Sequence, residues 1–214
     1  MNFTDILFDM DGTINESGRG IKSSFRYALE KLGLPAPEDG ELDYVIGPPL
    51  SWGFEKAGVP AEKIEEAIGL YREVYSGGGL FDSDPYPGIR EMLDTLRAAG
   101  KHLHIATSKP DNMTLRILDH FHMREYFEVI ATATMDESRN TKDAVIAWGL
   151  ERMTDIPGEN IVMVGDRYHD IEGAKVNGLK SVGVLWGYGS ERELTEAGAD
   201  WIVATPEELA ALLK

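Results

Sequence analysis

The chain has 214 residues, of which 21 are basic and 37 acidic, so its formal net charge is −16. Nucleic acids and anionic membranes repel such a broadly negative surface, which argues against either one as a partner. The absence of cysteine excludes disulfides and thiolate catalysis. The length allows one large domain, or a main domain with a smaller insert, and a sizeable hydrophobic core.

The sequence indicates neither a signal peptide nor a membrane span. Residues 1–11 carry three aspartates and no basic side chain, which is the wrong charge for the leading region of a signal peptide. No uncharged apolar run approaches the roughly 18 residues that a membrane span requires. We therefore expect a soluble, cytoplasmic protein, and a monomer or weak dimer.

The chain opens with a short apolar run, Ile6-Leu7-Phe8, that predicts a strand and is followed by Asp9 and Asp11. Strand periodicity puts both carboxylates on one side. Two crowded carboxylates repel each other and attract a cation, so the pair is costly unless it binds a metal or does chemistry. An ordinary turn is the alternative, since Asp-Gly after a strand is common turn chemistry.

From about residue 15 to residue 83 the patterns are helical, with no convincing strand. The glycines at 77–79 and the sequence Asp82-Ser83-Asp84-Pro85 indicate a hinge or a domain boundary. The predicted helices of this segment cover residues 21–33, 49–56 and 61–75.

Beyond Pro87 the predicted helices and strands alternate. Strands separated by helices of about ten residues imply parallel pairing, with helices covering the sheet. We therefore predict an α/β core of residues 1–14 and 84–214, with an all-helical insert at 15–83. The predicted helices are 88–99, 111–121 and 142–152, and the strands are 102–106, 127–131, 160–164, 181–185 and 201–203.

Three of the predicted strands end in polar groups. Open parallel sheets bind ligands beyond the carboxyl ends of their strands, so these groups should lie along one edge. The groups are Asp9 with Asp11, Thr107 with Ser108, and Asp166 with Asp170.

Asp9, Asp166 and Asp170 form an oxygen-rich set that suits Mg²⁺, which prefers carboxylates, waters and the phosphate oxygens of a substrate. Nothing in the sequence suits zinc. His102 and His104 share one face of a predicted strand, but no third ligand is evident, and we expect both to be structural.

Thr107, Ser108 and Lys109 precede a predicted helix start at Pro110-Asp111. Hydroxyls and free N–H groups at a helix N-terminus form a phosphate cradle, and simple helix capping is the alternative. An acidic site that handles phosphate needs a fixed cation, and Lys142, at the start of a later helix, is the candidate.

Four segments now stand out by their order and spacing: Asp9-Met10-Asp11-Gly12-Thr13, Ala106-Thr107-Ser108, Arg139-Asn140-Thr141-Lys142, and Gly165-Asp166-Arg167-Tyr168-His169-Asp170. Together they resemble the motifs of the haloacid dehalogenase superfamily of phosphatases. Segments 45–50 and 184–190 are similar to the phosphoglycolate phosphatase-like branch of that superfamily. Ser108 stands where many relatives of this branch carry asparagine.

The resemblance implies a three-layer, Rossmann-like parallel-sheet core and a mobile helical cap, in agreement with the insert at 15–83. It also implies that Asp9 attacks phosphorus to form an aspartyl phosphate. Asp11 would protonate the leaving oxygen and later deprotonate the hydrolytic water. Thr107 and Lys142 would hold the oxygens of the transferring phosphoryl group.

By the same resemblance, Mg²⁺ would be bound by the Asp9 carboxylate, the Asp11 main-chain carbonyl and Asp166, with Asp170 ordering metal-bound water. Gly12, Ser108 and Lys109 would contact the phosphate or the rest of the substrate. The candidates for substrate selection in the first cap helix are Lys22, Ser23 and Arg26, for which an ordinary exposed helix face is an equally good explanation.

The predicted function is a Mg²⁺-dependent phosphomonoesterase that acts on a small phosphorylated metabolite, such as phosphoglycolate or a 5′-nucleotide. Asp11 favours hydrolysis of a phosphate ester or anhydride, because the dehalogenase and phosphonatase branches lack an acid at this position. The alternatives are a sugar phosphomutase or an inorganic pyrophosphatase on the same scaffold, and a phosphate-binding module that has lost turnover.

Overall fold

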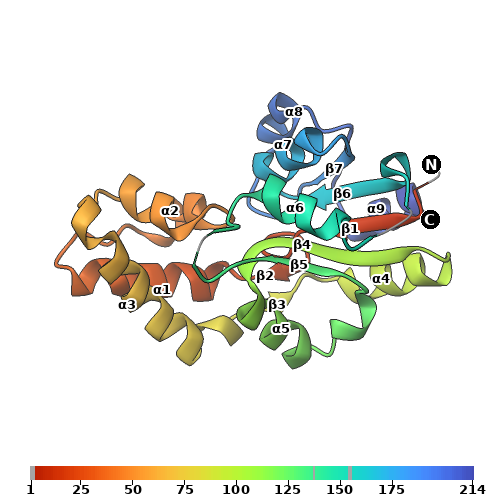
Figure 1. Ribbon diagram of the computed structural model, residues 1–214. Coiled ribbons are helices and arrows are strands. Elements are labelled where there is room, and N and C mark those ends of the chain that lie inside the picture. Colours follow the sequence, from red (N-terminus) through yellow and green to blue (C-terminus); the bar gives the residue numbers. More distant parts are fainter. Residues whose placement is uncertain (1–2, 137, 154–155) are drawn as a thin grey trace.

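A parallel sheet of six strands, in the order β5-β4-β1-β6-β7-β8, forms the centre of the core (Figure 1). The computed structural model describes residues 3–136, 138–153 and 156–214, so residues 1–2 of the predicted core lie outside the described ones. The strands are β1 (Asp5–Phe8), β4 (His102–Pro110), β5 (Ile130–Ala133), β6 (Ile161–Gly165), β7 (Lys180–Val184) and β8 (Trp201–Val203).

Both faces of this sheet are covered, as the side chains of β1 show. Ile6 and Phe8 pack into a cluster that includes α4, α5 and α9, whereas Leu7 packs on the other face with α6 and α7. An apolar run without alternation is typical of a parallel strand with two covered faces. The predicted three-layer α/β fold is confirmed. The core helices are α4 (Ile89–Ala98), α5 (Asp111–His120), α6 (Lys142–Leu150), α7 (Tyr168–Val176), α8 (Glu191–Ala197) and α9 (Pro206–Leu213).

The strand order reverses beside β1. The chain runs outward through β4 and β5, then returns past both strands to pair β6 with the other side of β1. Open sheets bind ligands in the crevice at such a reversal. The returning connection contains α6, whose first residue is Lys142, so the topology brings this lysine toward the carboxyl end of β1.

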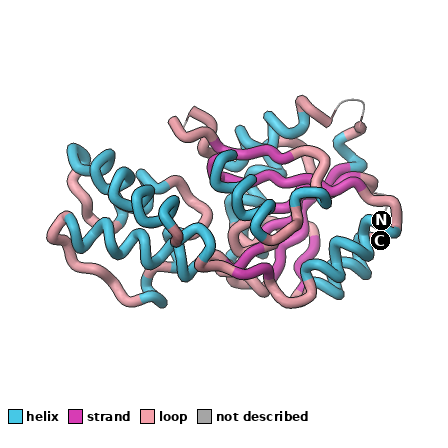
Figure 2. Tube along the Cα trace, turned by 90° about the horizontal axis from the view of Figure 1, so that it is seen from below, coloured by secondary structure: helices cyan, strands magenta, loops and turns pink. Residues whose placement is uncertain are grey.

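A lobe of helices lies beside the core (Figures 1 and 2). A two-stranded antiparallel pair, β2 (Asn15–Glu16) with β3 (Asp84–Pro85), joins it to the core, next to the predicted boundaries at residues 15 and 83. Strands of two residues are too short to leave a pattern in the sequence. The helices of the lobe are α1 (Gly18–Lys31), α2 (Leu50–Lys56) and α3 (Ile64–Gly77), with 3₁₀ turns at Asp39–Glu41, Asp43–Val45, Ala61–Lys63 and Gly79–Phe81.

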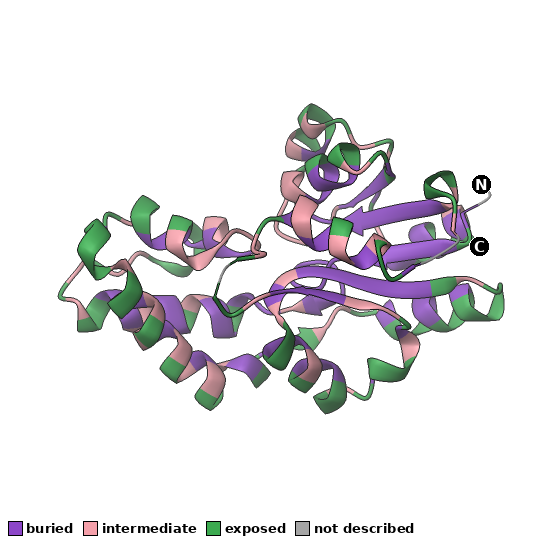
Figure 3. Ribbon diagram, viewed as in Figure 1, coloured by how far each residue is buried: buried purple, intermediate pink, exposed green. Residues whose placement is uncertain are grey.

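Helix α1 has the pattern of an amphipathic helix that faces its own small core. Ile21, Phe25, Ala28 and Leu29 are buried on one stripe, and the Phe25 ring stacks on Phe54 of α2 at 4.1 Å between centroids. In Figure 3 the helices of the lobe accordingly carry buried residues on their inner faces and exposed residues outside.

The end of α1 is a Schellman motif around Gly33, which has φ +72°. The N–H of Leu34 donates to the Leu29 carbonyl, and the N–H of Gly33 donates to the Glu30 carbonyl. The predicted stop at Gly33 is confirmed, although the helix starts at Gly18 rather than at residue 21.

Other predicted boundaries are also displaced by a few residues. Strand β5 starts at Ile130 rather than at residue 127, because Arg124–Tyr126 forms a 3₁₀ turn first. Helix α3 starts at Ile64, after the turn at Ala61–Lys63. Within the described ranges, no helix has both the length and the apolar composition that crossing a membrane requires.

His104 ties three segments together at the amino-terminal side of the sheet. Its Nε2 lies 3.0 Å from Oδ1 of Asp5 on β1, and its Nδ1 accepts the N–H of Val129 at 3.2 Å. The residue is 2% exposed. Burial lowers the pKa of His104, against the opposing effect of Asp5. The imidazole is therefore a neutral structural link, as expected.

This burial predicts a pH dependence of stability. Because the pKa of folded His104 lies below its ordinary value near 6.5, the unfolded chain binds a proton first as the pH falls. His104→Gln should therefore flatten the fall in the free energy of unfolding between pH 7 and pH 5, by up to about 1.4 kcal/mol per pH unit. Urea titrations at several pH values measure this slope. The control is the exposed His122, as His122→Asn; equal slopes for both variants would contradict the prediction.

Candidate active site

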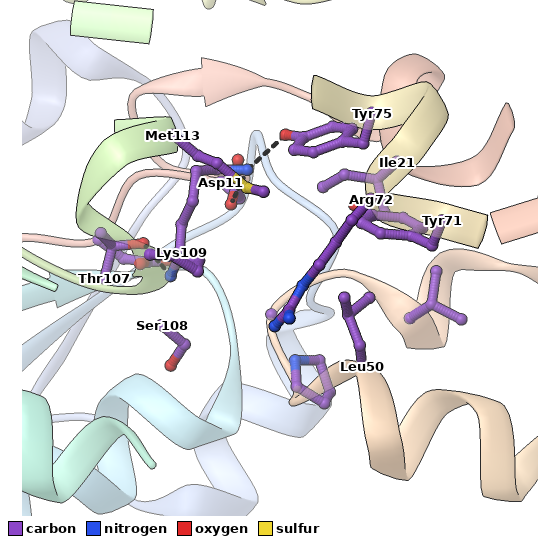
Figure 4. Close-up of a pocket in the computed structure, with 15 residues that line it drawn as sticks. Asp11, Ile21, Leu50, Tyr71, Arg72, Tyr75, Thr107, Ser108, Lys109 and Met113 are labelled. Carbon is purple, nitrogen blue, oxygen red and sulfur yellow. Dashed lines mark hydrogen bonds and ion pairs between the residues drawn. The ribbon is translucent and has the colours of Figure 1, made fainter. Parts of the chain in front are cut away.

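A cavity of about 80 Å³ lies between the carboxyl ends of the strands and the helical lobe. Figure 4 shows side chains from both parts pointing toward it. The core contributes Asp9, Asp11, Thr107, Ser108, Lys109, Pro110 and Met113, and the lobe contributes Ile21, Val45, Gly47, Pro48, Leu50, Tyr71, Arg72 and Tyr75.

Lys142 is buried between two of the carboxylates. Its Nζ lies 2.5 Å from Oδ1 of Asp9 and 2.8 Å from Oδ1 of Asp170, and it donates to the Ala106 carbonyl at 3.0 Å. The contacts with Asp9 and Ala106 are hydrogen bonds, whereas the contact with Asp170 is an ion pair. The predicted cation of the acidic site is therefore directly beside Asp9.

The burial of so many charges shifts their pKa values. Burial raises the pKa of Asp9 to about 7, against the attraction of Lys142, and repulsion from Asp170 and Asp11 adds to the rise. Burial also raises the pKa of Asp166 well above its ordinary value, with further repulsion from Asp170 and Asp9. For Lys142, burial acts to lower the pKa, but the carboxylates of Asp170 and Asp9 outweigh it and raise the pKa. One lysine thus offsets only part of the negative charge.

Asp9, Asp166 and Asp170 each offer a carboxylate oxygen, and these oxygens lie within 4.8 Å of one another. All three residues are at least 96% buried. Closely spaced buried carboxylates fit a hard divalent cation, which would stabilise their charged forms. The three acids predicted to be metal ligands are therefore brought together, while the Asp11 side chain points to a different partner.

Glycines allow the backbone to close tightly around Asp166. A Cβ atom on Gly12, which has φ +91°, would lie 2.2 Å from Oδ2 of Asp166. A Cβ atom on Gly187 would lie 2.3 Å from the Gly12 carbonyl oxygen, and one on Gly189 would lie 1.8 Å from the Asp166 carbonyl oxygen. Between these two glycines, the N–H of Tyr188 donates to Oδ2 of Asp166 at 2.8 Å. Because it has no side chain, Gly12 leaves room for the Asp166 carboxylate.

Asp11 faces Lys109 rather than the three acids. The Lys109 Nζ lies 3.0 Å from Oδ2 of Asp11 and also donates to the hydroxyl of Tyr75 on α3. Oδ1 of Asp11 is buried and has no hydrogen-bond partner among the residues that the structure describes. Lys109 therefore connects an acid of the core with the helical lobe.

Thr107 and Ser108 lie inside the end of β4, which continues to Pro110, rather than after it. The ladder to β5 is irregular between Thr107 and Pro110, and Oγ1 of Thr107 accepts the N–H of Lys109 at 3.2 Å. Helix α5 then starts at Asp111, as predicted. The irregular strand end turns Thr107 and Ser108 toward the cavity.

Lys22 and Arg26, the predicted selectors of the first cap helix, do not line this cavity. Lys22 forms an ion pair with Asp43, and Arg26 forms one with Asp39 and donates to the Pro37 carbonyl. Acidic residues of the lobe itself bind these cations. Their predicted contact with a substrate has no support in this arrangement. The hydroxyl of Ser23 likewise donates to the Gly20 carbonyl.

Two arginines at the boundary between lobe and core were not predicted. The Arg72 side chain of α3 lines the cavity and donates to the Met135 carbonyl at 3.1 Å. Arg167, at the start of α7, donates to the Ile46 carbonyl of the lobe at 3.0 Å and to Glu193 at 2.8 Å. Arg167 belongs to the motif at residues 165–170, but its contact with residue 46 depends on the position of the lobe, which no sequence pattern indicates.

Known proteins resemble this chain in sequence and in fold. Residues 6–184 match the family described as haloacid dehalogenase-like hydrolase. The chain is 36% identical over 200 residues to the 5′-nucleotidase of Pseudomonas aeruginosa, covering 91% of this chain and 88% of that protein. The crystal structure of a predicted phosphatase from Clostridium acetobutylicum superposes with a TM-score of 0.95 at 36% identity, over 100% of this chain and 99% of that one.

A further relative is longer than this chain. The tyrosine-protein kinase PtkA of Mycobacterium tuberculosis is 45% identical over 184 residues, which make up 86% of this chain and 62% of the kinase. This chain therefore spans less than two thirds of the length of that relative.

The chain belongs to the haloacid dehalogenase-like hydrolases. The resemblance predicted from the four motifs, and from the segments typical of the phosphoglycolate phosphatase-like branch, is confirmed.

Close packing around Asp166 gives a test of the site's construction. Gly189→Ala places a methyl group against the Asp166 carbonyl, so the backbone must shift at a cost of about 1–3 kcal/mol. Differential scanning calorimetry should show a fall in Tm of several degrees. The control is Gly69→Ala on the exposed face of α3, where a Cβ meets nothing within 4 Å and Ala improves helix propensity. A Tm of Gly189→Ala at or above that of the parent chain would contradict the packing.

Proposed function

We propose that the chain is a Mg²⁺-dependent phosphomonoesterase that hydrolyses a small phosphorylated metabolite through an aspartyl phosphate on Asp9. The observation that carries this proposal is the placement of Asp9, Asp11 and Thr107 on one cavity, with Lys142 beside Asp9. A nucleophilic carboxylate, a second acid and fixed cations are the groups that a stepwise phosphoryl transfer to water needs. The family of the chain supports the same reaction class.

Asp9 is the nucleophile in this proposal. One of its carboxylate oxygens forms a bond to phosphorus while the bond from phosphorus to the leaving oxygen breaks. The Lys142 ammonium, 2.5 Å from Oδ1, orients the carboxylate and favours its charged form. Lys142 then holds a phosphoryl oxygen together with Thr107, whose side chain lines the same cavity.

Asp11 transfers the protons. It donates one to the leaving oxygen, then accepts one from the water that attacks the aspartyl phosphate and releases inorganic phosphate. Lys109 contacts Oδ2, so Oδ1 is the oxygen available for this transfer. The Tyr75 contact on the far side of Lys109 would position Asp11 when the lobe is closed.

The metal-binding part of the proposal rests on the three crowded acids. Asp9 and Asp166 would hold Mg²⁺ with the Asp11 main-chain carbonyl, and Asp170 would act on its water ligands. When bound, Mg²⁺ supplies positive charge that shields the phosphate from the carboxylates. The glycines around Asp166 and the Tyr188 N–H fix the direction of that carboxylate.

We further propose that residues 15–83 are a cap that opens for substrate entry. The cavity, at about 80 Å³, is small beside the ~300–1,000 Å³ of ordinary ligand pockets. It has room for a phosphate and a few more atoms, so a 5′-nucleotide would need the cap displaced. Hydrogen bonds from Arg167, Arg72 and Arg116 to carbonyls across the boundary are contacts that such an opening can break.

Several finer points stay predictions. These are the cytoplasmic location, the monomer or weak dimer, and the absence of nucleic acid and membrane partners. Sugar phosphomutase and pyrophosphatase activities would use the same residues, and the similarity to PtkA adds phosphoryl transfer to a tyrosine as a reaction to test.

The test is phosphate release from phosphoglycolate, 5′-nucleotides, pyrophosphate and hexose phosphates, with Mg²⁺ and with excess chelator. We expect release from at least one small monoester, abolished by the chelator. Asp9→Asn should reduce the rate by at least about a thousandfold, since it removes the nucleophile. The matched control is Asp143→Asn, the same chemical change next to Lys142 in sequence but outside the cavity lining, which should keep the rate within about threefold.

Three results would overturn the proposal. Full activity of Asp9→Asn would remove the assigned nucleophile. Isomerised hexose phosphate without free phosphate would identify a mutase, and transfer from ATP to a tyrosine peptide without hydrolysis of any monoester would identify a kinase.

A further inference from the structure

Arg72 is a cation of the cavity that the proposed chemistry does not use. It lies on α3 next to Tyr71, is half-buried, and lines the same cavity as Asp9 and Asp11. In Figure 4 its side chain extends from α3 across the cavity, and its guanidinium ends near Leu50 on the side facing Ser108.

The contacts of Arg72 leave most of its donors available. Its one hydrogen bond in the described part of the chain goes to the Met135 carbonyl at 3.1 Å, and none of the ion pairs there includes it. A guanidinium has five N–H donors in a planar fork that matches a carboxylate or a phosphate. At least one edge of that fork is therefore free to bind an anion.

The other cations near the site already have carboxylate partners. Lys109 contacts Asp11, and Lys142 contacts Asp9 and Asp170. Among the described residues that line the cavity, Arg72 is the remaining cation, in a chain with a net charge of −16. Among the described residues no carboxylate forms an ion pair with this half-buried guanidinium, so an anionic ligand would gain from its positive charge.

We infer that Arg72 is a specificity-determining residue that binds a second anionic group of the substrate, a carboxylate or another phosphoryl group. The inference rests on the proposed function, since it takes the transferring phosphoryl group to lie at Asp9. The small cavity places the second anion within a few atoms of the first. The preferred substrate class is thus a short phosphate ester or anhydride with two anionic ends.

The test compares ligands that differ only in the second charge. Hydrolysis of phosphoglycolate is compared with that of its amide, in which an uncharged carboxamide replaces the carboxylate and the phosphate is kept. Calorimetric binding of phosphonoacetate is compared in the same way with that of phosphonoacetamide. The parent chain should prefer the anionic member of each pair. Arg72→Met should reduce kcat/KM for phosphoglycolate and the affinity for phosphonoacetate by about 10- to 100-fold. For the two amides, kcat/KM and affinity should stay within about threefold of the values for the parent chain.

Arg116→Met is the matched control. Arg116 also donates across the boundary, to the Ser76 carbonyl at 3.1 Å, but it does not line the cavity. If Arg72 only holds the lobe in place, Arg72→Met should affect charged and neutral ligands equally. That result, or equal use of both members by the parent chain, would overturn the inference and leave the phosphatase intact. If no monoester is hydrolysed, the proposed function fails, and the phosphonate affinities still decide whether Arg72 reads the second charge.

Discussion

The structure depends on holding several buried carboxylates at one point of a sheet. Asp9 follows the end of β1, Asp166 follows β6 and Asp170 lies in the first turn of α7, and all three are at least 96% buried. A buried ion pair repays its desolvation only when the geometry is good and the remaining donors are satisfied. Lys142 meets this condition through two carboxylates and the Ala106 carbonyl. The negative charge that it leaves over is the property on which the proposed metal binding and phosphate chemistry of the site depend.

This constraint explains local sequence features that secondary-structure patterns do not. Helix α7 was not predicted, although it contains Asp170. Its Gly173 is a poor helix former, yet a Cβ there would lie 2.9 Å from Cγ of Lys142. Gly165 leaves room for Asp170 in the same way, since a Cβ there would lie 2.2 Å from Cγ of Asp170. At Gly173, the residue that lets the backbone approach Lys142 is therefore also one that weakens the helical signal.

The proximity of the acids proposed for catalysis and metal binding could be predicted because the topology of a parallel sheet is highly restricted. Once Asp9, Thr107 and Asp166 each stand at a strand end, the fold has few ways to keep them apart. The positions of long side chains on the lobe are not restricted in this way. Lys22 and Arg26 bind neighbouring acids of the lobe, while Arg72 reaches the cavity. Their helix positions are equally suitable in the sequence, and only tertiary packing distinguishes them.

Arg167 connects the cluster of buried carboxylates with the helical lobe. Its main-chain N–H donates to Oδ2 of Asp170, and its guanidinium donates to the Ile46 carbonyl of the lobe. The carboxylate cluster and the lobe thus share one residue as a common support. Thermodynamic linkage then requires reciprocity: if closure of the lobe strengthens cation binding through Arg167, a bound cation favours closure by the same factor. Substrate entry and metal affinity are in that case two measurements of one coupling free energy.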